Sequence, residues 1–358
     1  MKEFFSAYWR GMASGTTTGA WSGGLRWSLI PLSLIYALIQ RIRSALYRAG
    51  LLTIRRLPRP VISVGNIAVG GTGKTPVTAH IAQLVMAQGV KVAVLSRGYG
   101  GSREGETIIV SDGKEIFLTA DECGDEPLLL ARTIPGLMVV MGSDRHAAGL
   151  LAMERLKPDL FLLDDGFQHL RLHRDLNILL LDCSRPFGNG WTMPGGLLRE
   201  PAGAALRADW IIHTRCRGHI VDIPFLTRIP QAACSYRLNK LVPLDGSEPI
   251  EMRSLAGCGV MACAGIAEPE QFFHSLEEEG LQLLRRLPLP DHAAYDSAVV
   301  SLVSGALRGS GARYCIVTEK DAVKLDGIPA DLAATILVAP LGLELEGDGL
   351  LTDILNLL

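Results

Sequence analysis

The chain has 358 residues, of which 48% are apolar and 20% charged, with a net charge of −2 and a mean hydropathy of +0.25. This composition excludes a highly charged, unfolded chain, and the length suits two ordinary domains with their own cores. The seven cysteines are scattered, odd in number and contain no C-x-x-C pair. They therefore argue against a disulfide framework or a zinc site, and we expect reduced cytoplasmic thiols.

The charge is unevenly distributed along the chain. Residues 1–60 hold nine basic side chains against Glu3 alone, a net charge of +8, so the remaining residues carry −10. A basic arm on an acidic body indicates an anionic partner, either a membrane or a nucleic acid.

An uncharged apolar segment, WSLIPLSLIYALIQ (residues 27–40), lies between Arg26 and Arg41. These 14 residues fall short of the roughly 20 that a membrane span needs, and no signal-peptide cleavage site follows. The apolar spacing continues along the chain and predicts one helix over Pro31–Ala49, with the proline in the first turn and Gly50 as the stop.

The basic surplus of this helix is not needed for packing, so we favour a helix lying in a membrane interface. It would be held there by apolar burial and by anionic lipid headgroups. Two alternatives stay open: a helix packed on the protein's own core, and a full span with the body on the cytoplasmic side.

Beyond Pro60, short apolar runs typical of buried strands alternate with helical patterns. The alternation predicts a doubly wound, mostly parallel α/β sheet with helices on both faces, in which ligands bind at the carboxyl ends of the strands. The expected strands are 61–64, 91–96, 137–141, 159–164, 177–182 and 209–213. The expected helices lie near 75–88, 125–132 and 144–156.

Four segments follow from these patterns. We expect an N-terminal arm over 1–58, a core domain over 59–218, a connecting segment with room for a hairpin over 219–258, and a smaller α/β subdomain over 259–358. The expected elements of the subdomain are strands at 259–266, 281–287 and 313–318 and helices near 268–279 and 296–308.

The segment AVGGTGKT follows a predicted strand and opens a predicted helix, which is the context required of a phosphate-binding loop. Its three glycines let backbone N–H groups curl around phosphate oxygens, and the helix N-terminus adds its dipole. The residues expected to bind the nucleotide here are Ala68, Val69, Gly70, Gly71, Thr72, Gly73, Lys74 and Thr75.

Two positions of this loop carry specific expectations. Lys74 would reach the β- and γ-phosphates, and Thr75 would hold Mg²⁺. Ala68 stands where the pattern G-x-x-x-x-G-K-[ST] has its first glycine. A small residue serves there if its φ is negative.

Two predicted strands end in carboxylates that are candidates for the Mg²⁺ site. DLFLLDDGFQH contains Asp164 and Asp165, and NILLLDCS contains Asp182. We favour the adjacent pair, because neighbouring carboxylates are costly unless a cation lies between them. Asp182 is the alternative, or it caps the loop that follows it.

Four acidic residues, Asp121, Glu122, Asp125 and Glu126, precede a predicted helix. Acidic residues favour the first turn of a helix, which is the ordinary role for such a group. Four acids within six residues exceed what a cap needs, so one of them is a candidate base for an acceptor hydroxyl.

Other polar residues follow predicted strands or occupy loops. Arg97 and Arg145 could neutralise charge on a transferring phosphoryl group, or could be surface residues. Arg199 and Glu200 in GGLLREP have the same ambiguity, and His292 in a polar loop would ordinarily be a surface residue.

Eight motifs in this order resemble the tetraacyldisaccharide 4′-kinase family: VGNIAVGGTGKTP, LSRGYGG, GDEP, GSDRHAA, LLDDGFQH, MPGGLLREP, PDHAAY and TEKDAVK. The resemblance runs from about Leu25 to the last motif, tolerates Ala68, and leaves residues 11–24 unmatched. It implies a P-loop core, a smaller C-terminal α/β subdomain, an N-terminal membrane-associated helix, and closure over the nucleotide.

The activity implied by this resemblance is transfer of the γ-phosphate of ATP, with Mg²⁺, to the 4′-hydroxyl of an acylated disaccharide 1-phosphate. The reaction belongs to lipid A synthesis at the cytoplasmic face of the inner membrane. The expected partners are this lipid substrate and an anionic membrane surface, with no nucleic acid, and we expect a monomer.

Residue roles also follow from the resemblance. Asp125 would be the general base assisted by His292, and the further catalytic residues would be Lys74, Arg97 and Arg145. The metal would be held by Thr75, Glu126, Asp164 and Asp165. Gln168 and Glu200 would contact the nucleotide, and His169 and Arg199 would line the site.

Three other classes of protein fit the sequence less well than the kinase family. A membrane-surface regulatory ATPase would carry a second loop lysine, where this chain has Val69. A GTPase would carry N-K-x-D, whereas TEKD (residues 318–321) places the aspartate directly after the lysine. A non-enzymatic lipid-binding module would account for the basic arm but not for the phosphate loop and the acids at strand ends.

Overall fold

The computed structural model describes residues 20–71, 73–216, 220–347 and 349–358. The nucleotide contact expected of Thr72 and most of the unmatched segment 11–24 lie outside these ranges. Two compact units emerge: unit 1 holds residues 1–94, 157–235 and 345–358, and unit 2 holds residues 95–156 and 236–344. The chain therefore passes from one unit to the other four times.

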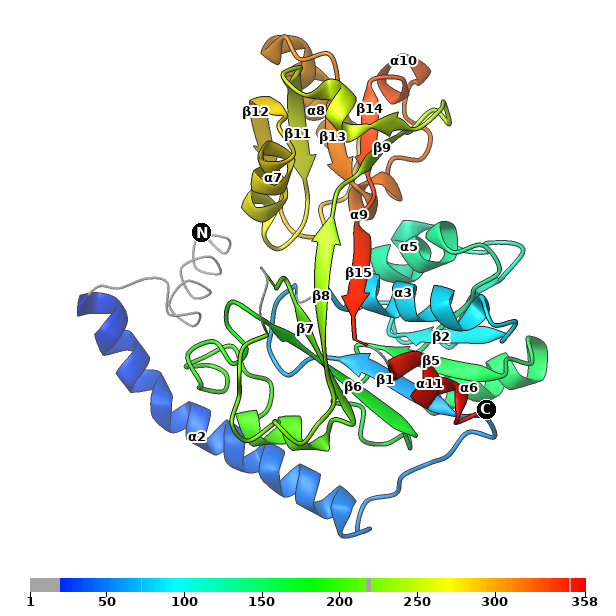
Figure 1. Cartoon of the computed structure of the whole chain (residues 1–358), viewed down its shortest axis with the longest axis vertical. Coiled ribbons are helices and arrows are strands. Elements are labelled where there is room, and N and C mark those ends of the chain that lie inside the picture. The colour runs from blue at the N-terminus through cyan, green and yellow to red at the C-terminus, as the bar shows by residue number, and fades with distance from the viewer. Residues whose placement is uncertain (1–19, 72, 217–219, 348) are drawn as a thin grey trace. The chain divides into compact units, whose positions relative to one another are not determined.

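Unit 1 is built on a sheet whose strands lie in the order β8-β7-β6-β1-β5-β2 (Figure 1). The pairings from β8 through β5 are all parallel. The strands are β1 (Val61–Gly65), β2 (Val92–Ser96), β5 (Leu160–Asp164), β6 (Leu176–Asp182), β7 (Trp210–Thr214) and β8 (Gln231–Arg237). Five of these strands match the expected ones closely, and the parallel α/β class is confirmed.

The remaining elements of unit 1 cover this sheet. Helix α3 (Lys74–Met86) buries Val77, Ile81 and Val85, and α11 (Leu350–Leu355) packs against it. The 3-10 helix η1 (Ala202–Arg207) contributes to a second apolar cluster with strand residues of β6 and β7. The core of unit 1 thus surrounds the strand and the helix that flank the phosphate loop.

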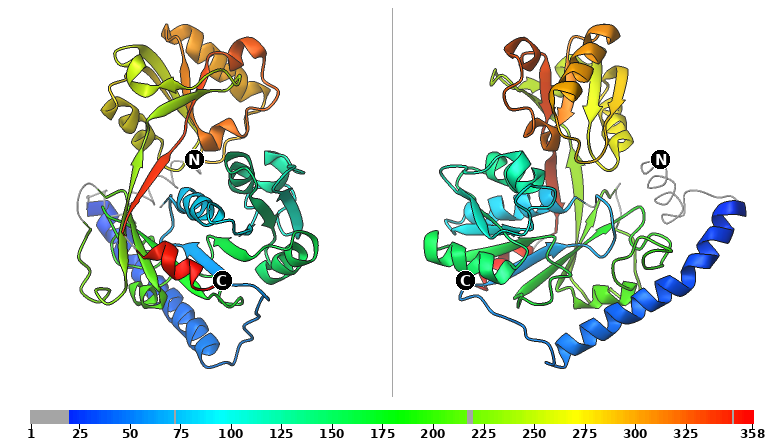
Figure 2. Two further views of the ribbon diagram at one scale, coloured as in Figure 1. Left: turned by 45° about the vertical axis from the view of Figure 1, so that its right-hand side comes forward. Right: turned by 180° about the vertical axis from the view of Figure 1, so that it is seen from behind.

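Helix α2 (Ala20–Arg48) is one continuous helix of 29 residues, visible as a long rod in both views of Figure 2. The expectation that it starts at Pro31 is wrong, because the proline lies inside the helix. A proline inside a helix removes one N–H donor and crowds a carbonyl of the preceding turn, and the helix nevertheless continues through Pro31. The end at Arg48, just before Gly50, is close to the expected stop.

The part of this helix from Ser28 to Arg48 is long and apolar enough to cross a membrane, by length and composition, and 6% of its apolar 18-residue window is buried. It contacts the rest of unit 1 through few side chains. Ser33 Oγ accepts a hydrogen bond from the Gly195 N–H at 2.8 Å, and Arg43 donates to the Gln168 carbonyl at 3.0 Å. The exposed apolar side chains are Leu32, Leu34, Ile35, Leu38, Ile39 and Ile42.

The expectation of seven reduced thiols is also wrong, because Cys183 and Cys216 form a disulfide. Cys183 follows β6 and Cys216 lies just beyond β7, and Asp182 pairs in register with Thr214. The parallel pairing brings the two Cα atoms to 5.2 Å, within the range that a disulfide spans. The free cysteines are Cys123, Cys234, Cys258, Cys263 and Cys315.

Residues 95–156 of unit 2 form an antiparallel strand pair and three helices. Strand β3 (Ile108–Asp112) pairs with β4 (Met138–Met141), and the helices are α4 (Ala120–Cys123), α5 (Asp125–Thr133) and α6 (Arg145–Arg155). Strand β4 and the two longer helices match the expected elements. Strand β3 was not expected, and its half-buried residues account for the weak apolar signal.

Unit 2 also contains a six-stranded sheet in the order β10-β9-β14-β13-β11-β12 (Figure 1). The strands are β9 (Lys240–Pro243), β10 (Ile250–Glu251), β11 (Gly259–Ala264), β12 (Gln282–Pro288), β13 (Cys315–Thr318) and β14 (Ile336–Ala339). Their two faces are filled by separate apolar clusters. Helix α7 (Pro269–Glu278) contributes to one cluster and α8 (Ser297–Ser310) to the other.

Short elements complete the chain. They are η2 (Met252–Leu255), α9 (Glu319–Ala322), α10 (Ala330–Ala333) and β15 (Gly342–Glu346). The segment 219–258, expected as a connection with room for a hairpin, supplies β8 to unit 1 and the antiparallel pair β9–β10 to unit 2.

Candidate active site

The phosphate loop joins β1 to α3 in unit 1. Gly70 has φ +130° and Gly73 has φ +75°. Residues other than glycine adopt these backbone conformations only with strain. The loop therefore turns sharply just before the helix, where free backbone N–H groups and the helix dipole favour a phosphate.

Ala68 does not need the conformational freedom of glycine. Of the described residues other than glycine, four have a positive φ, and Ala68 is not among them. Its backbone forms an antiparallel bridge with Leu198, and the Val69 N–H donates to the Leu197 carbonyl at 2.8 Å. The segment GGLLREP thus supports the first half of the loop.

A second support of the loop comes from Arg215, which the sequence did not single out. One of its guanidinium nitrogens donates to the Gly71 carbonyl, and the other donates to Asp182 Oδ2 at 2.9 Å. Asp182 also accepts hydrogen bonds from the Ser184 N–H and hydroxyl. Asp182 therefore caps the loop that follows it and anchors an arginine.

Asp164 ends β5 beside the start of α3 and is buried. Its Oδ2 accepts from the Thr75 hydroxyl at 3.3 Å, and its Oδ1 accepts from the Thr78 hydroxyl at 3.1 Å. Val64 of β1 lies in register with Asp164, which aligns the end of β5 with the entry to the loop. Thr78 was missed from the sequence, although it lies one helical turn after Thr75.

Asp165 adopts φ +53°, and its carboxylate lies beside basic side chains. Its carboxylate lies 2.8 Å from Arg199 Nη1 and 4.0 Å from Lys74 Nζ. Arg199 also donates to Gln168 Oε1 at 3.3 Å, and Gln168 in turn donates to the Asn66 carbonyl at 2.6 Å. These contacts gather Lys74, Asp165, Gln168 and Arg199 at the loop.

The Thr75 hydroxyl and the Asp164 carboxylate fit Mg²⁺, because this ion binds hard oxygen ligands and takes one or two carboxylates together with phosphates and water. Across the residues with described positions, no group of three or more His, Cys, Asp or Glu side chains forms a metal cluster. A Mg²⁺ site with few protein ligands, whose other ligands are oxygens of the nucleotide, agrees with that finding.

Glu200, expected at the nucleotide, is buried within unit 1. Its two carboxylate oxygens accept hydrogen bonds from Arg207 of η1 at 2.7 and 2.8 Å. This bidentate pair orients η1 and occupies both oxygens. The His169 backbone carbonyl accepts from Arg174.

In unit 2, Asp125 and His292 come together although 167 positions separate them in the chain. Asp125 opens α5 and is almost completely buried. Its Oδ2 accepts a hydrogen bond from His292 Nδ1 at 3.1 Å, and the Tyr99 ring packs against the imidazole in a T-shaped arrangement. His292 has φ +60°, so its backbone is held in a conformation that few side chains adopt.

Two lysines that the sequence did not single out join this pair. Lys324 Nζ lies 3.3 Å from Asp125 Oδ2, and Lys320 Nζ lies 3.3 Å from His292 Nε2 and 3.2 Å from Asp291. Burial raises the pKa of Asp125, but the His292 hydrogen bond and the charges of both lysines outweigh it and leave the pKa below its usual value. The carboxylate form of Asp125 is thereby stabilised.

The other expected residues of unit 2 lie in more ordinary places. Arg97 is exposed and pairs with Glu104, while Arg145 is buried and one of its guanidinium nitrogens donates to the Gly142 carbonyl. Glu122 forms a capping box with Thr119, which is the ordinary role weighed for these acids. Glu126 is half-buried in the first turn of α5, in unit 2, whereas Thr75, Asp164 and Asp165 belong to unit 1.

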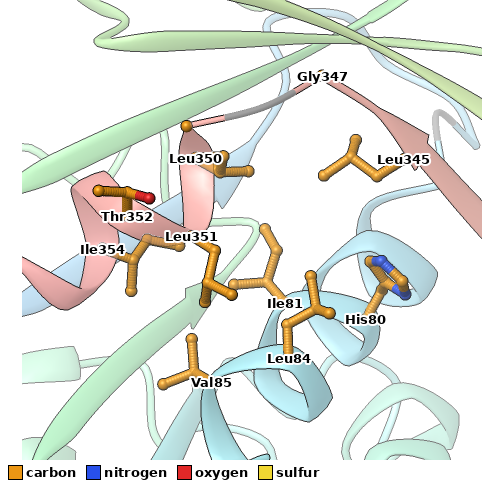
Figure 3. A pocket seen from close by; sticks show the side chains of 11 residues that line it. His80, Ile81, Leu84, Val85, Leu345, Gly347, Leu350, Leu351, Thr352 and Ile354 are labelled. Carbon is orange, nitrogen blue, oxygen red and sulfur yellow. The ribbon is translucent and has the colours of Figure 1, made fainter. Parts of the chain in front are cut away.

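A separate cavity of about 360 Å³ lies between α3 and α11 in unit 1. Figure 3 shows Ile81, Leu84 and Val85 of α3 facing Leu350 and Leu351 across it. None of the expected site residues lines this cavity, so it is a gap in the packing of two helices and not the phosphate site.

The parallel sheet, the strand–loop–helix phosphate site and the Thr75–Asp164 contact define a P-loop nucleotide-binding enzyme. The tetraacyldisaccharide-1-P 4′-kinase family (LpxK) matches residues 25–358. The chain belongs to this family, whose members act on a lipid disaccharide.

Curated relatives agree with this membership. The tetraacyldisaccharide 4′-kinase of Pelobacter propionicus is 56% identical, with 99% of both chains covered. That of Geobacter sulfurreducens is 51% identical, covering 93% of this chain and 94% of the relative. A crystal structure of LpxK from Aquifex aeolicus in complex with ATP is 35% identical with a TM-score of 0.80, covering 93% of this chain and 99% of that one.

Proposed function

We propose that the chain transfers the γ-phosphate of ATP to the 4′-hydroxyl of a tetraacyldisaccharide 1-phosphate in lipid A synthesis. Membership of the kinase family supports the reaction class and the lipid disaccharide, and the ATP complex of the Aquifex aeolicus protein supports the donor. The observation that carries the proposal is the contact between Asp125 and His292, because a P-loop enzyme that phosphorylates a hydroxyl uses a base for the acceptor proton.

Unit 1 supplies the nucleotide functions in this proposal. The loop 68–75 binds the phosphates through its backbone N–H groups, and Lys74 neutralises their charge. Thr75 and Asp164 would hold Mg²⁺, which supplies positive charge to the phosphate oxygens when bound. Arg199 and Gln168 orient Asp165 and the end of β5, as their hydrogen bonds indicate.

Unit 2 supplies the proton acceptor. The side-chain contacts that Asp125 makes with His292 and with Lys324 both end on its Oδ2. Among the described residues Oδ1 has no hydrogen-bond partner, so this oxygen is the one we assign to the acceptor hydroxyl. The hydroxyl proton would move to Asp125 as the hydroxyl oxygen attacks the γ-phosphorus and the bond from that phosphorus to ADP breaks, so that ADP leaves. His292 would hold the carboxylate in place.

Arg97 and Arg145 would neutralise charge on anionic groups of the substrates, and Glu126 would help to bind the metal. Glu200 would act on the nucleotide side only indirectly, through Arg207 and the segment that supports the loop.

The location we propose is the cytoplasmic face of the inner membrane, with the chain acting as a monomer and without nucleic acid. Helix α2 supports it, because the helix exposes a continuous apolar surface and carries basic residues at its end. An acylated acceptor stays in the bilayer, so an enzyme that binds the membrane surface meets it there. The helix could lie flat or span, since its length allows both.

The test is phosphoryl transfer from labelled ATP to tetraacyldisaccharide 1-phosphate in mixed detergent micelles, with and without Mg²⁺. We expect one labelled lipid product, and its formation should depend on both the lipid and the metal. ATP hydrolysis that ignores the lipid and yields no labelled lipid would instead favour a membrane-surface regulatory ATPase.

A further inference from the structure

Lys324 is a buried lysine in a sequence motif, TEKDAVK, to which the proposed function gives no role. Its side chain is 6% exposed. The ammonium group donates to Asp125 Oδ2 at 3.3 Å and to the Ala293 carbonyl at 3.0 Å, and it lies 3.6 Å from Asp321 Oδ1. It also lies over the Tyr295 ring, 5.4 Å from the centroid. A buried ammonium with this many partners has one fixed position.

Asp321, the second carboxylate at Lys324, is fully buried and rigidly held. The Thr318 hydroxyl donates to its Oδ2 at 2.6 Å, and the Gly265 N–H lies 3.1 Å from each carboxylate oxygen. A Cβ at Gly265 would approach Asp321 Oδ1 to 2.8 Å, so the close contact requires glycine. Asp321 therefore gives Lys324 a second carboxylate contact that is itself held in place.

The same glycine also holds the histidine of the proposed base. The Gly265 carbonyl accepts a hydrogen bond from the His292 N–H at 3.3 Å. Asp321 thus contacts the glycine that holds His292, and Lys324 contacts Asp125 directly. Together they support both members of the Asp125–His292 pair. Lys320 contacts the pair at His292 Nε2.

We propose that Lys324 is a positioning residue for phosphoryl transfer. It holds Oδ2 of Asp125 in place together with His292, and this leaves Oδ1 directed to the acceptor hydroxyl. The inference rests on the proposed role of Asp125 as the base. Without the ammonium group, the buried carboxylate would keep one partner instead of two and would populate other side-chain rotamers.

Lys324 could also act only as a structural link between two parts of unit 2. That role can be tested separately from the positioning of Asp125, because a second contact links the same two parts. Arg132 of α5 donates to Asp326 Oδ1 at 3.0 Å and to the Val323 carbonyl at 3.3 Å. It therefore connects the helix of Asp125 to the segment of Lys324 without touching the base. Arg132→Met is the matched control for the loss of such a connection.

The experiment measures kcat and the KM for ATP and for the lipid with the full chain in mixed micelles. Lys324→Met should lower kcat by about 10- to 100-fold, a part of the 10²–10⁴ that a positioned base contributes. The KM for ATP should stay within about twofold, since the nucleotide residues lie in unit 1. Lys324→Arg keeps a cation and should recover most of kcat, whereas Arg132→Met should match the wild type.

Two further variants make the test specific. In an Asp125→Asn background, Lys324→Met should have no additional effect on kcat, because residues that act as one unit are not additive. If Lys324→Met does not fold, Lys324→Gln serves in its place, because its amide keeps a donor for the Ala293 carbonyl.

Wild-type kcat in the Met or Gln variant would overturn the inference. So would an equal loss in Lys324→Met, Lys324→Arg and Arg132→Met, which would mark a mechanical connection only. A wild-type chain that transfers no phosphate to the lipid would instead overturn the proposed function.

Discussion

Asp125 Oδ2 and His292 Nδ1 lie 3.1 Å apart, and Lys324 Nζ lies 3.3 Å from the same carboxylate oxygen. A carboxylate that accepts from two basic groups through one oxygen is held ionised and oriented. In the proposed mechanism this carboxylate takes the proton of the acceptor hydroxyl, which makes Asp125 the first residue to test.

Asp125→Asn should lower kcat by about 10²- to 10⁴-fold, because the amide keeps the shape of the side chain but cannot accept the proton. ATP affinity should stay within about twofold, since a base acts mainly in the transition state. Steady-state kinetics and equilibrium ATP binding would measure the two effects. Asp121→Asn removes an exposed charge nearby and should behave as the wild type; full activity of Asp125→Asn would remove this residue from the mechanism.

The phosphate loop and most of the sheet could be predicted from the sequence because their signals are local. Strands buried on both faces read as continuous apolar runs, as in β1 and β5, and a glycine-rich loop that ends in G-K-T between a strand and a helix is specific to phosphate binding. Strands β3 and β8 are only half-buried along much of their length, and their apolar runs were too weak to recognise.

The contacts that complete the site depend on the tertiary fold and gave no local signal. Lys324 reaches Asp125 across 199 positions, and Arg215 reaches Gly71 across 144. The disulfide of Cys183 likewise follows from the adjacency of β6 and β7, which cysteine spacing alone does not reveal. His292 was recognised only through the resemblance of its motif to a family.

Asp164→Asn should raise the Mg²⁺ concentration needed for half-maximal activity by about 10- to 100-fold, the range seen when the support of a metal site is lost. The reason is that Asp164 is the carboxylate in contact with the Thr75 hydroxyl. Mg²⁺ titrations of the kinase reaction measure this. Asp182→Asn should have a smaller effect, because that carboxylate is occupied by Ser184 and Arg215; the reverse order would move the metal to the end of β6.

Ala68→Gly should leave activity within a few-fold of the wild type, because Ala68 has no positive φ and bonds through its backbone. Gly73→Ala is the contrasting variant. Its φ of +75° would strain an alanine by about 1 kcal/mol or more, and ATP affinity should fall by about fivefold or more. Binding titrations with ATP compare the two, and equal losses would mean that the first loop position needs glycine after all.

Thiol labelling tests the disulfide and the burial of the free cysteines. Burial raises the pKa of Cys123 and of Cys263 to about 12, so at pH 8 both are protonated and react slowly. Cys258 is exposed and should react first. Without reductant, unfolding should expose the five free thiols, and reduction should then yield all seven. Seven reactive thiols before reduction would contradict the Cys183–Cys216 bond.

Replacing the exposed apolar residues of α2 should release the chain from membranes. Ile35, Leu38, Ile39 and Ile42 are each at least half exposed, and burial of each in a bilayer interface is worth about 1 kcal/mol. Changing all four to serine should therefore weaken binding to anionic vesicles by about 10²-fold or more. Equilibrium binding of ATP to unit 1 should persist.

Leu206→Ser removes an exposed leucine elsewhere in unit 1 and should leave vesicle binding unchanged. Vesicle co-sedimentation at increasing salt measures the apolar and the electrostatic parts. Retention of the four-serine variant on the vesicles would place the membrane contact outside α2.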